Sequence, residues 1–415
     1  MSILYNIFIH LLIFGMKVFA LFNSKTKKGV EGRRHSLLCV QSAFSETDRV
    51  IWMHAASLGE YEQGLPVLEQ LKEKFPDRKI LITFFSPSGY EHVVKRKHIA
   101  DAICYLPFDR KSHIKAFLSQ FSAELFFTVK YEYWYHLLQE LKKKKVKIYV
   151  ISALFYDGQS FFTSYGKWFV KQLQLTVDWF FHQTDVSFAL AKSIGLTRSS
   201  VTGDTRFDRV KQLRDGHFEV PFISEFIGDD KVVVFGSSWQ AEEKIAEEIW
   251  AGNPYTRLIM APHDLKRVQR LKEIFPDAIL YSRIESEARN NSRVLIIDSI
   301  GWLSKLYHYA DIAVVGGGFH EAGLHNILEA ATFGVPVIFG NHYKKNPEAD
   351  GLIAADGGRA FENSGRAADF VLFLLRNEEM LKAMSSRAEN FITEKPDSTQ
   401  LIIKKMMSQS ETGKK

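Results

Sequence analysis

The chain has 415 residues, of which 46% are hydrophobic and 25% are charged, a composition that is ordinary for a globular protein of two domains. Cys39 and Cys104 are the only cysteines and lie far apart in the sequence, which excludes a disulfide framework and a cysteine-based zinc site. The formal net charge of +6 favours an acidic partner, which leaves nucleic acid, an anionic lipid surface and a phosphorylated substrate as candidates.

The N-terminal stretch MSILYNIFIHLLIFGMKVFALF is apolar over about 20 residues, roughly the length that crosses a hydrocarbon core, and basic residues follow it. Because basic residues stay on the cytoplasmic side, we expect residues 1–24 to form a membrane anchor with a cytoplasmic catalytic body. No basic region precedes the apolar run, as it would in a cleaved signal peptide. A helix that lies in the membrane interface is the alternative, because His10 and Lys17 are costly at mid-bilayer.

Short apolar runs alternate with helical patterns from Arg49 to about Asp208, in the order VIWMHA, KILITFF, AICYLP, LFFTV and KIYVISAL. A second series begins with KVVVFGSS and continues through YTRLIMAPHD, AILYS, RVLIID, IAVVGGG and VPVIFG. This alternation predicts two α/β domains with parallel sheets. We expect an N-terminal domain over residues 25–210, a linker over 211–230, a C-terminal domain over 231–400 and a tail over 401–415. Such domains bind ligands in a cleft beside the carboxyl ends of their strands.

The segment WMHAASLGEYEQGLPVLEQL, which begins at Trp52, joins a strand to a helix and places Glu60 at the start of that helix. A turn of this kind usually presents free backbone N–H groups to an anion. Glu60 therefore either stabilises the helix start or takes part in chemistry.

The segment VVGGGFHEAGLHNILEAATFGVPVIFG, residues 314–340, ends a strand with Gly316, Gly317 and Gly318, where the backbone can approach a ligand closely. Glu329 follows Asn326 by about one helical turn, so that its carboxylate can accept hydrogen bonds from two ribose hydroxyls. The structural alternative is a tight glycine turn, with Asn326 as a cap and Glu329 as a first-turn helix charge.

These segments, together with HAASLGE, YEYW, VTGDTRFD and GSSWQAEE, resemble the 3-deoxy-D-manno-octulosonic acid (Kdo) transferases of Gram-negative bacteria, in order from about residue 33 to 358. The resemblance implies a GT-B fold, in which two Rossmann-like domains face each other across a cleft. It also implies a CMP-Kdo donor, a lipid A precursor as acceptor, and a place at the cytoplasmic face of the inner membrane. It implies no metal or other cofactor, and no nucleic acid partner.

The resemblance also assigns roles to single residues of the first half. Glu60 matches the catalytic glutamate of HAASLGE, and a base at this position would take the proton of the acceptor hydroxyl. Glu132 matches the second glutamate of an ETELW-like element, whose first glutamate is replaced here by Lys130. Lys130 is either a surface residue or a contact for a carboxylate of Kdo or a phosphate of the acceptor. Arg206 keeps a positive charge where the family often has lysine.

In the second half, Gly236, Ser237 and Ser238 lie at a strand-to-helix turn suited to the phosphate of CMP. His263 in APHDLKRV stands where the family has the arginine of a PRH-like sequence, and Arg267 matches a downstream arginine of the family. With the glycines, Asn326 and Glu329, these residues form the expected donor site.

Two other functions compete with Kdo transfer. A nucleotide-sugar epimerase has the same two-domain fold, but these enzymes are soluble, and neither the apolar N-terminus nor HAASLGE fits one. A non-enzymatic lipid-binding protein explains the N-terminus but leaves the glycine turn and HNILEA without a task.

Overall fold

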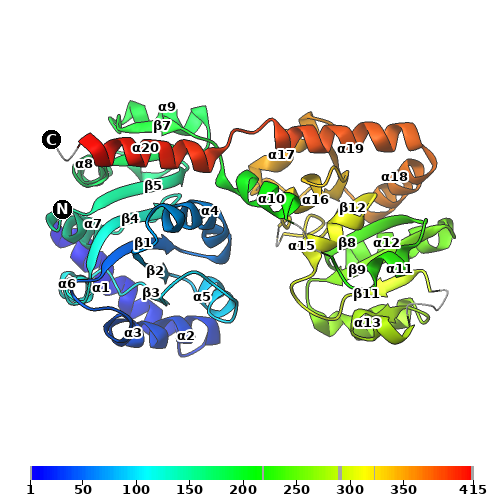
Figure 1. Ribbon diagram of the computed structural model, residues 1–415, viewed down its shortest axis with the longest axis horizontal. Coiled ribbons are helices and arrows are strands. Elements are labelled where there is room, and N and C mark those ends of the chain that lie inside the picture. The colour runs from blue at the N-terminus through cyan, green and yellow to red at the C-terminus, as the bar shows by residue number, and fades with distance from the viewer. Residues whose placement is uncertain (1, 217–218, 288–291, 322, 413–415) are drawn as a thin grey trace. The chain divides into compact units, whose positions relative to one another are not determined.

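The structure is a computed structural model that describes residues 2–216, 219–287, 292–321 and 323–412. It divides into two compact units, of which unit 1 comprises Met1–Arg209 and Pro396–Lys415, and unit 2 comprises Val210–Lys395. Each unit contains a seven-stranded sheet in which all pairings are parallel. The predicted α/β class with two parallel sheets is therefore confirmed (Figure 1).

The sheet of unit 1 has the strand order β3-β2-β1-β4-β5-β6-β7. Its strands are β1 (Arg49–Ala55), β2 (Lys79–Phe84), β3 (Ala102–Tyr105), β4 (Ser122–Val129), β5 (Lys147–Ala153), β6 (Trp179–His182) and β7 (Ser199–Val201). The helices are α1 (Ser2–Phe19), α2 (Ser24–Gly32), α3 (Ser36–Ala43), α4 (Leu58–Lys74), α5 (Pro87–Val93), α6 (Lys111–Leu118), α7 (Tyr135–Lys143), α8 (Lys167–Thr176), α9 (Asp185–Ser193) and α20 (Ser398–Thr412), with 3-10 turns at Arg33–His35 and Ser160–Phe162.

The sheet of unit 2 has the order β10-β11-β9-β8-β12-β13-β14. Its strands are β8 (Lys231–Ser238), β9 (Thr256–Pro262), β10 (Ile279–Leu280), β11 (Val294–Ile296), β12 (Ile312–Val315), β13 (Val337–Gly340) and β14 (Gly358–Phe361). The helices are α11 (Ile223–Ile227), α12 (Gln240–Gly252), α13 (Val268–Ile274), α14 (Ile284–Glu287), α15 (Leu303–Leu306), α16 (Leu328–Ala331), α17 (Pro347–Ala354), α18 (Ser364–Arg376) and α19 (Glu378–Thr393), with 3-10 turns at Leu265–Arg267, Tyr281–Arg283 and Tyr307–Tyr309; α10 (Thr205–Asp215) begins in unit 1.

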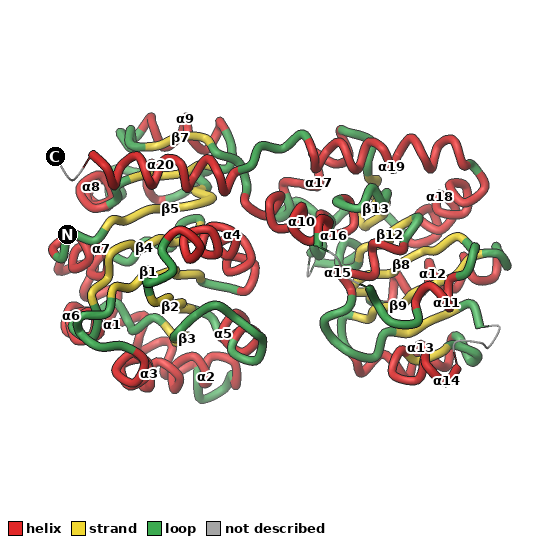
Figure 2. Tube along the Cα trace, in the orientation of Figure 1, coloured by secondary structure: helices red, strands yellow, loops and turns green. Residues whose placement is uncertain are grey.

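Both sheets have helices on their two faces (Figure 2), which explains why their strands are apolar runs without alternation. In β1 every residue after Arg49 is buried. Trp52 packs into the cluster on one face of the sheet and Met53 into the cluster on the other. Because β1 is packed on both faces, its carboxyl end is held in place, and the turn that carries Glu60 begins directly after it.

Two segments contain more structure than the sequence predicted. Residues 401–415, expected to be a tail, include most of α20, which packs against α4. Ile402, Ile403 and Met406 of α20 are buried in the core of unit 1, and their spacing gives the helix one apolar face. Residues 211–230, expected to be a linker, include α11, where Ile223 and Phe226 are buried.

Candidate active site

The turn between β1 and α4 holds Glu60 in a fixed position. Ser57 is the N-cap of α4, and its hydroxyl oxygen accepts a hydrogen bond from the Glu60 backbone N–H at 3.5 Å. The Glu60 carboxylate turns back and accepts a short hydrogen bond from the Ala56 N–H. This arrangement is close to a capping box, so Glu60 does stabilise the helix start, as the structural alternative predicted.

Glu60 is nevertheless buried in a way that a simple capping carboxylate is not. Its exposed fraction is 7%, and burial, with a smaller effect of the nearby Glu132 carboxylate, raises its pKa to about 7. The Ala56 N–H and the Lys130 ammonium oppose this rise, but they do not cancel it. A carboxylate with a pKa near the working pH is well matched to accept a proton.

Glu132 and Lys130 lie in the loop that follows β4, the sheet neighbour of β1. Lys130 has a left-handed backbone with φ of 62°, and its N–H donates to the Ile151 carbonyl at 3.0 Å. The Glu132 carboxylate accepts a hydrogen bond from Trp134 Nε1 at 3.1 Å. The structure therefore brings together Glu60, Lys130 and Glu132 from two adjacent strand ends.

His54 is a member of this group that the sequence did not identify. The side chain is fully buried, and its Nδ1 is hydrogen-bonded to Thr83 Oγ1 at 3.0 Å. Its Nε2 lies 3.8 Å from the nearer carboxylate oxygen of Glu132, beyond hydrogen-bond distance. His54 is adjacent in sequence to the Ala55–Ala56 turn, but only the β1–β4 pairing places it beside Glu132.

Arg206 forms an ion pair inside unit 1. Its Nη2 lies 2.7 Å from Asp204 Oδ2, and Asp204 also accepts a hydrogen bond from Gln63 of α4 at 2.9 Å. Burial opposes ionisation of Asp204, but Arg206 and its hydrogen bonds hold the Asp204 pKa below its usual value. This pair ties the start of α10 to the helix that carries Glu60.

The predicted donor-site glycines serve backbone packing within unit 2. A Cβ on Gly316 would lie 2.0 Å from the Ser237 carbonyl oxygen, and one on Gly318 would lie 2.6 Å from the Gly340 nitrogen. Gly317 has φ of 91°, and a Cβ there would lie 2.2 Å from the Gly323 oxygen. Gly236 similarly leaves room for the Tyr307 hydroxyl. These four positions require glycine for close packing, whether or not a ligand binds there.

Ser237 and Ser238 end β8, next to the glycine turn after β12. Ser237 has φ of 51°. Ser238 is fully buried, and its hydroxyl has no hydrogen-bond partner within the described ranges. A buried hydroxyl without a partner destabilises the fold unless a ligand or water forms a hydrogen bond with it. This is the feature of the turn that points to a polar ligand.

An aromatic cluster of Trp239, His263, His320 and His325, which the sequence did not predict, lies beside this turn. The ring centroids of Trp239 and His263 are 4.4 Å apart and nearly parallel, and those of His263 and His325 are 4.7 Å apart. Burial, aided by His263 and His320, lowers the His325 pKa to about 4. Burial also lowers the pKa of His263. Neutral imidazoles can stack on a base and donate one hydrogen bond each, but they supply no positive charge for a phosphate.

Arg267, Asn326 and Glu329 have partners within unit 2. Arg267 donates two hydrogen bonds of 2.5 Å to the two carboxylate oxygens of Glu243, a bidentate pair typical of structural arginines. Asn326 donates to Glu329 Oε1 at 2.9 Å and accepts from the Leu328 N–H at 3.1 Å. Asn326 and Glu329 are thus adjacent, as their spacing predicted.

The described part of the chain contains no group of three or more His, Cys, Asp or Glu side chains placed to hold a metal ion. The Glu60 group and the Ser238 turn both lie at the carboxyl ends of strands, where parallel sheets bind ligands.

Comparison with known proteins indicates that the chain is a glycosyltransferase. Residues 31–209 match the family model of 3-deoxy-D-manno-octulosonic-acid transferase (kdotransferase). A 3-deoxy-D-manno-octulosonic acid transferase of Chlamydia trachomatis is 25% identical over 85% of this chain and 84% of its own length, and one of Aquifex aeolicus is 26% identical over 74% and 80%. A bifunctional glycosyltransferase/methyltransferase of Fusobacterium nucleatum is 28% identical over 71% of this chain, and the match spans 48% of that relative, about half its length.

Among solved structures, the UDP-GlcNAc 2-epimerase of Neisseria meningitidis bound to UDP-GlcNAc is similar with a TM-score of 0.60 and 17% identity, covering 87% of this chain and all of the epimerase. A likeness at this identity shows the fold alone. Together with the two parallel sheets, it confirms the predicted GT-B fold.

Proposed function

We propose that this chain, a glycosyltransferase related to the Kdo transferases, moves Kdo from CMP-Kdo to a lipid A precursor with Glu60 as the general base. The observation that carries the assignment of the base is the burial of Glu60, which raises its pKa to about 7 beside Glu132 of the adjacent strand end. A carboxylate that only capped a helix would gain nothing from this burial, because burial disfavours its charged form.

The reaction joins an acceptor hydroxyl oxygen to the anomeric carbon of Kdo and breaks the bond from that carbon to the phosphate of CMP. The hydroxyl proton passes to the Glu60 carboxylate as the new bond forms, and CMP leaves with the electron pair of the broken bond. Burial and, to a smaller extent, the Glu132 carboxylate raise the pKa of Glu60, whereas the Ala56 N–H and the Lys130 ammonium lower it, so these groups together set the fraction of ionised base at neutral pH. In this proposal Glu132 stands near the reacting sugar, and the Lys130 ammonium binds a carboxylate or phosphate of a substrate.

The donor site that we propose lies in unit 2, at the turn after β8. The orphaned hydroxyl of Ser238 supports a phosphate contact, with Gly236 and Ser237 shaping the backbone around it. Glu329, held by Asn326, accepts from the ribose hydroxyls. His263 contributes a stacking face beside Trp239. Arg267 is engaged by Glu243, so it contributes to the donor site through that pair.

The acceptor is a lipid, so the proposal places the enzyme at the cytoplasmic face of the inner membrane. The apolar helix α1, which is long enough and apolar enough to cross a membrane by length and composition, supports a membrane location. In this proposal the partner that complements the net charge of +6 is anionic lipid and not nucleic acid.

A product assay tests the proposal. The full chain is incubated with CMP-Kdo and a lipid A precursor, and the lipid product is analysed by mass spectrometry. We expect a mass increase of one or more Kdo units and release of CMP. UDP-GlcNAc alone should stay unchanged, since epimerisation of that sugar would favour the epimerase alternative. Absence of any Kdo-bearing lipid from a folded, CMP-binding protein would contradict the proposal.

A further inference from the structure

The N-terminal helix α1 is fixed to the body of unit 1 by partly buried polar contacts. The Tyr5 hydroxyl donates to Asp109 Oδ2 at 2.6 Å and accepts from the Tyr135 N–H at 3.1 Å. One residue further, Asn6 Oδ1 accepts a hydrogen bond of 2.6 Å from His136 Nε2. Moving α1 away from the body would remove one hydrogen-bond partner each from Asp109 and His136, which are buried, and such a loss is costly.

The inner face of α1 continues this contact with apolar side chains. Ile9 and Ile13 have exposed fractions of 2% and 9%, and they line a contact region with Phe85, Leu106 and Phe108 of the body. The attachment therefore runs over more than two helical turns, from Tyr5 to Ile13. A helix held along its side in this way cannot also be surrounded by lipid on all sides, as a spanning helix is.

The outer face of α1 carries a stripe of exposed apolar side chains. Phe14 has an exposed fraction of 67%, and Phe22 just after the helix has 82%. The outer stripe consists of Leu4, Ile7, Phe8, Leu11, Phe14, Val18, Leu21 and Phe22, all more than 40% exposed. The spacing of three and four residues places the members within α1 along one side, and a stripe of this length on a protein surface marks an interaction site.

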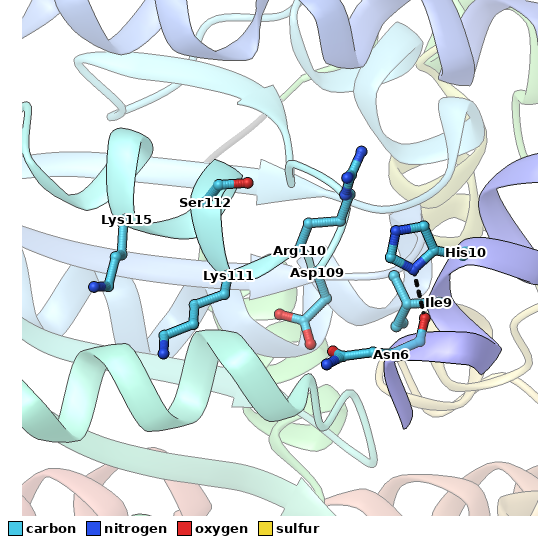
Figure 3. A pocket seen from close by; sticks show the side chains of 8 residues that line it. All are labelled: Asn6, Ile9, His10, Asp109, Arg110, Lys111, Ser112 and Lys115. Carbon is cyan, nitrogen blue, oxygen red and sulfur yellow. Dashed lines mark hydrogen bonds between the residues drawn. The ribbon is translucent and has the colours of Figure 1, made fainter. Parts of the chain in front are cut away.

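Cationic side chains lie where α1 meets the start of α6. A cavity of about 460 Å³ lies there between Asn6, Ile9 and His10 of α1 and the segment from Asp109 to Lys115. Figure 3 shows Lys111 and Lys115 extending to one side of the chain and Arg110 to the other. The lining thus includes three cations, Arg110, Lys111 and Lys115.

The charge of this cavity is not neutralised by the protein. Asp109 is the acidic residue in its lining, and its carboxylate already accepts hydrogen bonds from Tyr5, His136 and Leu137. Arg110, Lys111 and Lys115 are exposed and form no ion pair with any carboxylate in the described part of the chain. Exposed cations beside an apolar stripe complement the phosphates and acyl boundary of an anionic bilayer.

We propose that α1 lies in the plane of an anionic lipid bilayer, with the outer stripe buried at the acyl boundary and the cationic cavity occupied by headgroup phosphates. The inner face of α1 stays attached to unit 1, so that unit 1 sits directly on the membrane surface. This seating depends on the contacts of α1 and α6, and it does not require that the chain transfer Kdo.

The first experiment measures binding of the full chain to vesicles. Vesicles of phosphatidylcholine alone are compared with vesicles that contain about 30 mol% phosphatidylglycerol. A triple variant, Arg110→Gln, Lys111→Gln and Lys115→Gln, removes the charge of the cavity. The control triple variant, Lys144→Gln, Lys192→Gln and Lys404→Gln, removes three exposed cations at the end of α7, on α9 and on α20. Circular dichroism checks that each variant is folded.

We expect the cavity variant to lose about fivefold in affinity for anionic vesicles per charge removed, on the order of 100-fold in all, and the control variant to lose much less. Equal losses in both variants, or equal binding of the unaltered chain to neutral and anionic vesicles, would overturn the proposal. A third result would also overturn it: the unaltered chain does not bind vesicles but self-associates, and Phe14→Asn abolishes the self-association. A second copy of the chain would then cover the stripe.

The second experiment separates the in-plane helix from a spanning one. Single cysteines replace Leu4, Leu11 or Phe19 in a chain that carries Cys39→Ser and Cys104→Ala, and each is labelled with the fluorophore NBD. Dithionite, which does not cross bilayers, is added outside vesicles to which the protein was bound. We expect all three labels to be reduced at similar rates. Protection of the label at position 4 with rapid reduction at position 19 would mean that α1 spans the bilayer.

Discussion

Replacing Glu60 with glutamine should remove transfer and at the same time stabilise the protein at neutral pH. Burial raises the Glu60 pKa from 4.5 to about 7, and at roughly 1.4 kcal/mol per pKa unit this shift corresponds to about 3 kcal/mol. The raised pKa means that the folded state holds a proton that the unfolded state releases. The stabilising effect of protonation is therefore present below pH 4.5 and lost as the pH rises through 7.

Glutamine is uncharged at every pH and keeps an oxygen that can accept from the Ala56 N–H. The free energy of unfolding of Glu60→Gln relative to the unaltered chain should therefore grow by about 2 to 3 kcal/mol between pH 5 and pH 8. In a unit of this size such a change raises the melting temperature by several degrees. Transfer should fall by on the order of 10²–10⁴ when the general base is lost.

Thermal unfolding at pH 5 and pH 8 and the transfer assay are run on the same preparations. Glu73→Gln, at an exposed position of the same helix, controls for the loss of one carboxylate from α4 and should change neither quantity much. Two results would refute the reasoning. A stability difference between Glu60→Gln and the unaltered chain that does not change with pH would show that the pKa of Glu60 is not raised by burial. Near-normal turnover by folded Glu60→Gln would exclude Glu60 as the base.

Three further changes test the neighbouring assignments. Glu329→Ala should weaken CMP and CMP-Kdo alike, because the proposed contacts are to the ribose; unchanged CMP affinity in calorimetry would contradict that assignment. Tyr5→Phe should cost about 1–3 kcal/mol of stability, measured by urea unfolding, since it leaves Asp109 short of one donor; a loss below a few tenths would show that α1 is only loosely attached. Lys130→Gln removes a charge that lowers the Glu60 pKa, so the acidic limb of the pH–rate profile should move to higher pH. A limb that stays in place or moves to lower pH would exclude this role.

The sequence predicted the fold well because parallel sheets have a strong local pattern. The run VIWMHA corresponds to β1, and KVVVFGSS coincides with β8. Each strand is buried on both faces, so nearly every residue must be apolar, and this pattern is visible without knowledge of any contact. The place of Glu60 at the start of α4 was predictable for the same reason, because Ser57 and Glu60 have the spacing of an N-cap and its partner.

Contacts between distant segments were not predictable in this way. The pairing of Tyr5 with Asp109 spans 104 residues, and neither residue carries a local sign of it. His54 was visible only as part of a strand, and its nearness to Glu132 depends on the β1–β4 pairing. The attached face of α1 was not predictable either. Nearly all residues of the N-terminal stretch are apolar, so the sequence does not distinguish those that face the body from those that are exposed.

The left-handed backbone at Lys130 and Ser237 adds a physical argument about the two candidate sites. Both residues follow or end a strand at a predicted site, and both have positive φ without being glycine. Such a conformation costs of order 1–3 kcal/mol and persists only where the surroundings fix it. Glycine would adopt it freely, so backbone geometry alone does not account for a lysine and a serine there. Lys145, Ser152, Phe222 and Asp356 have the same conformation without an assigned role, so the role that we propose for Lys130 rests on its position beside Glu60, and that of Ser237 on its position beside the buried Ser238.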